Sequence, residues 1–407
     1  MSQSKIFNIC NIYIFIWILY MFHWQNLGSL FPALDSISNL LLAINLAISI
    51  YYSFVFWNKY KQVPIFISIN ILLISMIIYG ILSLIGFNLI DTFMHKEADI
   101  NSGTYLISAL RTFLPIYTFY IFTKKGYITE KYISNLVWIF LPLCIFIFFA
   151  NKFVLISNDM ENLGEMRTNN SAYLFVSFFP LIYFIRSYRL LQFVVIALVL
   201  FLTITGIKRG AILLVSIATL CFLYHQWKQV SLLNKVLLFS FIVLLIFVGI
   251  TFVEDLADSS SVVQNKIEKT MEGNTSGRDE IVSNLLDVFF SSSVFNLFFG
   301  LGADATLFYG LQAHNDWVEI LFNQGIIGFF LFSLFWFFVF VIWRYQVIKN
   351  SDMAFFLTLW LTCNFLRTFF SMWYSTANIM TTLPFGYFLA NICFKRHKII
   401  NRDETVY

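Results

Sequence analysis

Charged residues are scarce in this sequence. Only 12% of its 407 residues are Asp, Glu, Lys or Arg, which is about half the share found in soluble proteins, whereas 59% are hydrophobic. So few charges do not cover the surface of a water-soluble protein, which excludes soluble enzymes and disordered chains. The net charge of +4 is also too small and too dispersed for a nucleic-acid-binding protein. An integral membrane protein is the class that remains.

Cysteine is rare as well, and the sequence has no motif of a metal site. The five cysteines lie inside apolar runs and none forms a CxxC pair: Cys10, Cys144, Cys221, Cys363 and Cys393. We expect them to pack as small apolar residues rather than form disulfides or bind a metal. Because an HExxH motif is absent too, no metal and no cofactor is predicted.

Long apolar runs fill most of the chain. A helix needs roughly 20 apolar residues to cross the hydrocarbon core of a membrane, and continuous runs favour helices over strands. The sequence therefore predicts an all-α, polytopic membrane protein with about 12 transmembrane helices. The first follows Lys5 and has no small-residue cleavage site after it, so we expect it to be retained. The predicted spans are 6–24, 36–57, 64–86, 104–122, 132–150, 170–185, 190–206, 210–225, 233–253, 324–343, 353–371 and 377–394.

The lysines and arginines of the short loops predict the orientation. These basic residues occur in every second loop, as the positive-inside rule requires, and most acidic residues fall in the loops of the opposite side. Both termini are therefore predicted to be cytoplasmic. The basic residues of the predicted cytoplasmic side include Lys59, Lys124, Lys125, Lys131, Arg186, Arg189, Lys228, Arg344 and Lys349.

The segment 281–302 is apolar but is not predicted to cross the membrane. It contains Asp287 and three consecutive serines, and a crossing would move Arg344 and Lys349 to the outer side. We expect it to form a helix that lies at the outer interface. The chain then divides into the first nine transmembrane helices at 1–253, a large outer loop with interfacial helices at 254–323, and the last three transmembrane helices with a cytoplasmic tail at 324–407.

Several cations fall on the predicted outer side, against the general bias. They are Arg111, Arg167, Lys208, Arg209, Arg278 and Arg367. Arg111 and Arg367 lie within predicted spans, where an arginine costs about 2.5–3.5 kcal/mol on insertion scales. Such a residue needs either a partner in the protein or an anionic ligand, and the sequence leaves both open for these two arginines. Arg167 has Glu161 and Glu165 close by, which favours an ion pair.

Two of these arginines lie where a helix is predicted to begin. Arg209, preceded by Lys208, enters a span, and Arg278 precedes the interfacial helix. A helix N-terminus presents unpaired backbone N–H groups, so an arginine there makes a favourable phosphate site. Capping and the helix dipole explain the neighbouring Asp279 and Glu280. They do not explain a cation at this end of a helix, whereas an anionic ligand does.

A third polar segment, 313–325, leads into the next predicted span. Helical spacing places His314 on one face with Val318, and Glu319 on the face of Asn315. One interpretation is an ordinary polar helix start at the membrane interface. The other makes His314 a base or a group that orients a hydroxyl, because a neutral imidazole accepts a proton near pH 7.

In their order and predicted side, these segments resemble the membrane glycosyltransferase superfamily of bacterial O-antigen polymerases and O-antigen ligases. The matching elements are Lys208-Arg209-Gly210, Ser276-Gly277-Arg278, and His314-Asn315 followed by Gly325, all within residues 190–345. A serine commonly precedes the first arginine in that family, and Lys208 stands in its place here. The resemblance implies a bacterial inner-membrane enzyme whose active site and large loop are periplasmic.

The resemblance also implies the substrates and the roles of residues. The donor would be a glycan on undecaprenyl pyrophosphate, the acceptor a lipid-linked sugar, and the transfer inverting and independent of metal. Arg209 and Arg278 would stabilise the departing pyrophosphate by bidentate hydrogen bonds, and His314 would take the acceptor's proton. Membrane lipid is an expected partner, and chain-length regulators and flippases are candidate protein partners. The residues predicted to bind substrate are Lys208, Arg111, Arg367, Asn315 and Glu319.

Three functions are compatible with these features. The leading one is an O-antigen repeat-unit polymerase. An O-antigen ligase, which transfers the glycan to lipid A–core, shares the motifs, and only the greater number of polymerases favours the first. A transporter or flippase for lipid-linked sugars belongs to another class, in which polar groups lie near the bilayer midplane on broken helices. Here the unusual cations gather on one predicted face beside a large loop, which favours catalysis.

Overall fold

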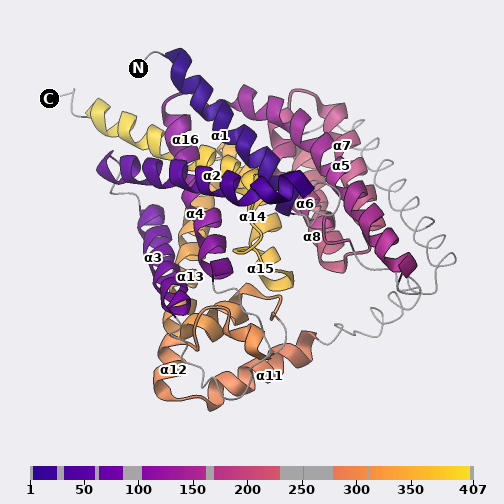
Figure 1. The fold of residues 1–407 in the computed structure, drawn as a ribbon. Coiled ribbons are helices and arrows are strands. Elements are labelled where there is room, and N and C mark those ends of the chain that lie inside the picture. The colour runs from indigo at the N-terminus through magenta and orange to yellow at the C-terminus, as the bar shows by residue number, and fades with distance from the viewer. Residues whose placement is uncertain are drawn as a thin grey trace.

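A computed structural model describes residues 3–24, 32–59, 64–85, 103–161, 169–229, 251, 278–309 and 312–403 (Figure 1). In these ranges the chain is built from helices and turns, and they contain no strand. The all-α prediction is therefore confirmed. Arg167 and the Ser276-Gly277 pair, which the sequence pattern singles out, lie outside the described residues.

Helices cover most of the residues of the predicted spans, but the predicted spans 170–185 and 353–371 are each divided between two elements. The elements are α1 (Gln3–Trp24), α2 (Pro32–Lys59), α3 (Pro64–Leu84), α4 (Gly103–Lys124), α5 (Glu130–Glu161), α6 (Ala172–Phe178), η2 (Phe179–Ile185), α7 (Arg189–Thr205), α8 (Arg209–Gln229), α11 (Arg278–Ser291), α12 (Val294–Phe299), η3 (Ala305–Tyr309), α13 (Asp316–Ile348), α14 (Asp352–Asn364), α15 (Arg367–Phe370) and α16 (Ile379–Asp403). The predicted span 233–253 falls outside the described residues except for Thr251.

Among the described residues, 7 helices are long and apolar enough to cross a membrane. Shorter apolar helices occupy Ile9–Met21, Ala172–Ile185, Arg189–Thr205 and Ile379–Ile392, where four further spans are predicted. The chain is thus a helical protein of transmembrane character. The total of about twelve spans stays a prediction.

Helix α4 lies at the centre of one half of the bundle, packed against α2, α3 and α16. Its side chains from Arg111 to Phe122 are all buried, so this stretch faces protein on every side. Gly386 of α16 allows the backbones to approach closely, because a Cβ there would lie 2.8 Å from the Cβ of Phe119. The other half consists of α5, α6, η2, α7, α8 and α14, and α13 joins the halves by packing on both α3 and α14.

Two of the loops predicted on the same side of the membrane meet at one end of the bundle. At one end Arg186, after η2, forms an ion pair with Glu130 at the start of α5. At the other end lie α11 and α12, away from the start of α1 and the end of α16 (Figure 1). The topology and the assignment of the two ends to cytoplasm and periplasm stay predictions.

The predicted interfacial segment 281–302 forms two helices rather than one. The chain breaks after α11, and the Ser293 hydroxyl caps α12 by accepting a hydrogen bond from the Asn296 N–H at 3.2 Å. Leu285 and Phe289 of α11 pack in a small separate core with Leu301, Ala305, Ala313 and Phe322. Large apolar side chains of the segment are exposed, among them Phe290 and Val294, as expected of helices at a membrane interface.

Two glycines hold this outer segment against α13. Gly325 has φ 67° and ψ −164°, so α13 consists of a short helix, 316–324, followed by a long one, 326–348. Gly300 also has a positive φ of 76°, and a Cβ on it would come 2.4 Å from the backbone of Asn323. Only glycines allow this conformation and this approach at once. The contact fixes the polar loop between α12 and α13, which carries His314.

Candidate functional site

The starts of α8 and α11 meet at the end of α15. The carbonyl oxygen of Phe370 accepts one hydrogen bond from Nη1 of Arg278 at 3.1 Å and another from the Tyr173 hydroxyl at 3.3 Å. Gly210, the second residue of α8, lies against the same group, since a Cβ there would come 2.4 Å from the Tyr173 hydroxyl and 3.5 Å from Phe370. Two of the three predicted segments are therefore neighbours in the fold.

The turn before α8 has the predicted form. Gly206 ends α7, Ile207 follows with a left-handed φ of 53°, and α8 begins at Arg209. The Lys208 carbonyl accepts the first helical hydrogen bond, from the Ile212 N–H at 3.0 Å. Lys208 and Arg209 thus lie at a helix N-terminus, where the backbone N–H groups and the helix dipole favour an anion.

Arg278 is likewise the first residue of its helix. Asp279 and Glu280 follow in the first turn of α11, as predicted. Their negative charges are favourable at this helix end, whereas the guanidinium of Arg278 is not. Its hydrogen bond to the Phe370 carbonyl directs it toward α15 and the start of α8.

His314 lies with these cations but not on a helix. The expected helical face that it shares with Val318 is wrong, because α13 begins only at Asp316 and His314 has a left-handed φ of 51°. The helix starts there because Oδ1 of Asn315 accepts hydrogen bonds from the N–H groups of Trp317 (3.0 Å) and Val318 (3.3 Å). Asn315, predicted to bind substrate, therefore has its side-chain oxygen engaged as an N-cap.

The environment of His314 favours the neutral imidazole. Burial lowers its pKa from the usual 6.5, and the positive charges of Arg278 and Lys208 lower it further. A pKa below 6.5 leaves the ring unprotonated at pH 7, able to accept a proton. The Trp317 Nε1–H, three residues after His314, donates to the Thr368 hydroxyl of α15 at 2.8 Å, so the third predicted segment also reaches α15.

Glu319 is hydrogen-bonded to the loop that carries His314. The side chain is fully buried, and its two carboxylate oxygens accept hydrogen bonds from the Thr306 hydroxyl and, at 3.0 Å, from the Ala313 N–H. Glu319 is predicted to bind substrate, and in the structure both of its oxygens are hydrogen-bonded inside the protein. Nearby Asp304 is bound by the Thr104 hydroxyl at 3.0 Å, and burial raises its pKa to about 6.

Arg367 lies inside the protein, beside the ring of Tyr173. It is buried, donates to the hydroxyls of Ser177 (3.1 Å) and Thr376 (2.7 Å), and stacks on the ring of Tyr173, 4.8 Å from its centroid. Buried Asp316 accepts a hydrogen bond from the Trp373 N–H at 2.8 Å. Arg367 therefore supports Tyr173 and the chain after α15.

Arg111 is also internal. It is buried in α4 and donates to the Tyr20 hydroxyl at 3.3 Å and to the Ser375 carbonyl. The sequence left open whether the intramembrane arginines meet protein groups or a ligand. For both, the structure supplies neutral oxygens of the protein as hydrogen-bond partners.

Sequence reasoning missed Tyr173 and Phe370, which join the segments. Tyr173 is one of 20 tyrosines and Phe370 one of 50 phenylalanines, and Phe370 contributes only its backbone carbonyl. The one local signal is the polar run Asn169-Asn170-Ser171 at the start of α6, which marks a structured turn.

A cavity of about 770 Å³ lies away from the cation cluster, at the opposite ends of α8, α13 and α14. Over the ranges that the structure describes, no three His, Cys, Asp or Glu side chains are grouped so that they could hold a metal ion. No family model, no curated protein and no solved structure matches this chain.

Proposed function

We propose that the chain is a membrane glycosyltransferase, an O-antigen repeat-unit polymerase of the bacterial inner membrane. It transfers a glycan from undecaprenyl pyrophosphate to a lipid-linked sugar at the periplasmic face. The observation that carries the proposal is that the segments carrying Lys208, Arg209, Arg278 and His314 meet around α15 at one end of the bundle. Cations at two helix N-termini suit a diphosphate, and a neutral imidazole beside them suits proton transfer.

The roles follow from the charge changes of the reaction. The bond between the anomeric carbon of the donor and the pyrophosphate oxygen breaks, and the pyrophosphate leaves with the electron pair. Arg209 and Arg278 bind the departing anion, and Lys208 adds a further positive charge. The acceptor oxygen forms the new bond to the anomeric carbon, and its proton passes to His314. Removing one preorganised contact of this kind raises the barrier by about 2.7–4 kcal/mol.

The buried residues around the cluster act on its geometry. Glu319 and the Asn315 cap hold the loop and helix on either side of His314. Arg367 and Tyr173 hold the end of α15, whose carbonyl orients Arg278. We assign these residues positioning roles, because each is engaged inside the protein.

An Arg278→Lys variant tests the proposal. Purified protein with lipid-linked repeat units should form new glycosidic bonds without any added transferase, and the variant should lose most of this activity, because an ammonium group cannot replace a bidentate guanidinium. Arg344→Lys, an exposed arginine at the other end of α13, is the matched control. A wild-type protein that moves glycolipid across vesicles but forms no bonds is a transporter, which would refute the proposal.

Deletion in the native host separates polymerase from ligase. A strain without the polymerase should still attach single repeat units to its core lipid. Accumulation of long chains on undecaprenyl pyrophosphate, with a bare core, would identify a ligase.

A further inference from the structure

The cavity at the other end of the bundle is not used by the proposed reaction. It has a volume of about 770 Å³ and lies between the starts of α7 and α14 and the ends of α8 and α13. Helix α8 runs from the cation cluster to this cavity, and its 21 residues span about 30 Å at 1.5 Å per residue. In a membrane-spanning chain these helix ends lie at the level of the lipid headgroups.

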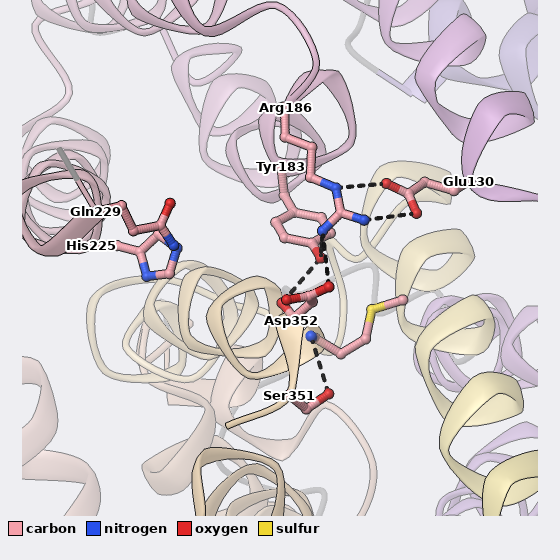
Figure 2. Close-up of polar contacts among 8 residues, drawn as sticks. Glu130, Tyr183, Arg186, His225, Gln229, Ser351 and Asp352 are labelled. Carbon is pink, nitrogen blue, oxygen red and sulfur yellow. Dashed lines mark hydrogen bonds and ion pairs between the residues drawn. The ribbon is translucent and has the colours of Figure 1, made fainter. Parts of the chain in front are cut away.

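One cation of the lining is neutralised within the protein. Figure 2 shows Arg186 between Glu130 and Asp352, with Nε 2.9 Å from Oε1 of Glu130 and Nη1 3.7 Å from Oδ2 of Asp352. It also donates to the Tyr183 hydroxyl at 2.9 Å. This network joins α5, η2 and α14 and fixes one wall of the cavity.

Two other cations of the lining are exposed. In the part of the chain that the structure describes, Arg189 has no acidic partner within 4 Å. Lys228 lies over the ring of Tyr224, with its nitrogen 4.4 Å from the centroid. Both line the cavity from neighbouring helices, α7 and α8, so the cavity has a rim of available positive charge.

The rest of the lining combines apolar surface with a polar atom that has no partner. His225 stacks on Phe355 at 3.6 Å between ring centroids and is hydrogen-bonded to the side chain of Gln229. Both His225 and Gln229 lie across from Arg186 (Figure 2). Gln192 is 2% exposed and donates to the Ile182 carbonyl, but its Oε1 meets no donor among the described residues. A buried amide oxygen of this kind needs a donor from a ligand or water.

We propose that this cavity binds an anionic glycerophospholipid whose headgroup carries free hydroxyls. The phosphate lies at Arg189 and Lys228, a headgroup hydroxyl donates to Oε1 of Gln192, and the glycerol backbone and first methylenes lie against the apolar lining. Basic pockets between helix ends are typical sites for such headgroups. A soluble phosphate complements the charge and the unpaired oxygen, whereas a lipid also complements the apolar surface.

Native mass spectrometry of the full chain in detergent tests this proposal, with phosphatidylglycerol and phosphatidylcholine supplied separately at equal concentrations. An Arg189→Gln/Lys228→Gln variant should bind phosphatidylglycerol about tenfold more weakly for each charge-assisted hydrogen bond lost. Arg344→Gln/Lys349→Gln is the matched control. These residues have the same types and lie at the same end, Lys349 also lies over a tyrosine ring at 4.3 Å, and neither lines the cavity.

The outcomes separate the sources of phosphate. The proposal is supported if the wild type and the control variant prefer phosphatidylglycerol and the cavity variant does not. Equal losses in both variants would mean general surface attraction and would overturn it. A thermal shift with inorganic phosphate as large as that with the lipid, lost in the cavity variant, would mean a soluble anion and would also overturn it. Each readout is independent of glycosyl transfer, so the proposed function can fail while this proposal stands.

Discussion

The contact between Gly210 and Tyr173 gives a sharp test of how the candidate site is assembled. In a Gly210→Ala variant the new methyl group would lie 2.4 Å from the Tyr173 hydroxyl, and ordinary contact begins near 3.4 Å. The two groups must therefore separate by about 1 Å. Because Tyr173 is buried on α6, this movement strains the packing and weakens its hydrogen bond to the Phe370 carbonyl.

The expected loss of stability follows from these two effects. Overpacking a buried contact costs about 1–3 kcal/mol, and a lost neutral hydrogen bond about 0.5–1.5 kcal/mol. Tyr173→Phe alone should lose only the second amount. The double variant removes the hydroxyl that the methyl group would contact, so it should lose only the hydrogen bond and be more stable than the sum of the two single changes by about 1.5–4.5 kcal/mol.

Thermal and denaturant unfolding of the four proteins in one detergent measures this double-mutant cycle. The readout does not depend on catalysis, so it tests the geometry alone. Additive losses would mean that the start of α8 does not meet Tyr173, and the convergence of the cationic segments would then have no basis.

Three further changes test the loop and the helix that follow α12. Burial, and then the charges of Arg278 and Lys208, lower the pKa of His314 below its usual 6.5, so its base form stays populated down to that lowered pKa. The activity of the wild type should therefore fall only at a pH below 6.5. An acid limb above pH 6.5 in the pH–rate profile would contradict this. Asn315→Ala should destabilise the protein by about 1 kcal/mol while Asn315→Asp retains the cap, and equal melting temperatures for both would argue against capping. Gly325→Ala should destabilise far more than Gly126→Ala, because both have positive φ but only the first would place a Cβ 2.4 Å from a backbone atom; equal melting temperatures would count against the backbone contact at α12.

The sequence predicted the features that depend on local patterns. Apolar runs gave the helices, and the turn at Gly206 gave the start of α8 at Arg209. The acidic residues in the first turn of α11, Asp279 and Glu280, were also predicted. In each case the signal lies within a few residues of the feature, so a single sequence contains it.

The features that escaped prediction depend on contacts between distant segments. The break at Gly325 exists because the backbone of Gly300 packs against it, and nothing near 325 in the sequence encodes that approach. Glu319 is of a residue type that is common in functional sites, but in the fold its two oxygens accept hydrogen bonds from Thr306 and Ala313. Helical spacing misplaced His314 because the Asn315 cap begins the helix after it.

The arginines show why charge alone does not identify a site in a membrane protein. Arg111 and Arg367 are as unusual in the sequence as Arg209 and Arg278, because all four fall on the predicted outer side. The first two are enclosed by hydroxyls and carbonyls, which supply the hydrogen bonds that lipid cannot. The other two begin helices, where the dipole repels a cation. Hydrogen bonds to these protein groups offset the cost of burying an arginine in the first setting, whereas the helix dipole opposes the charge in the second, so the second setting is the one that favours a bound anion.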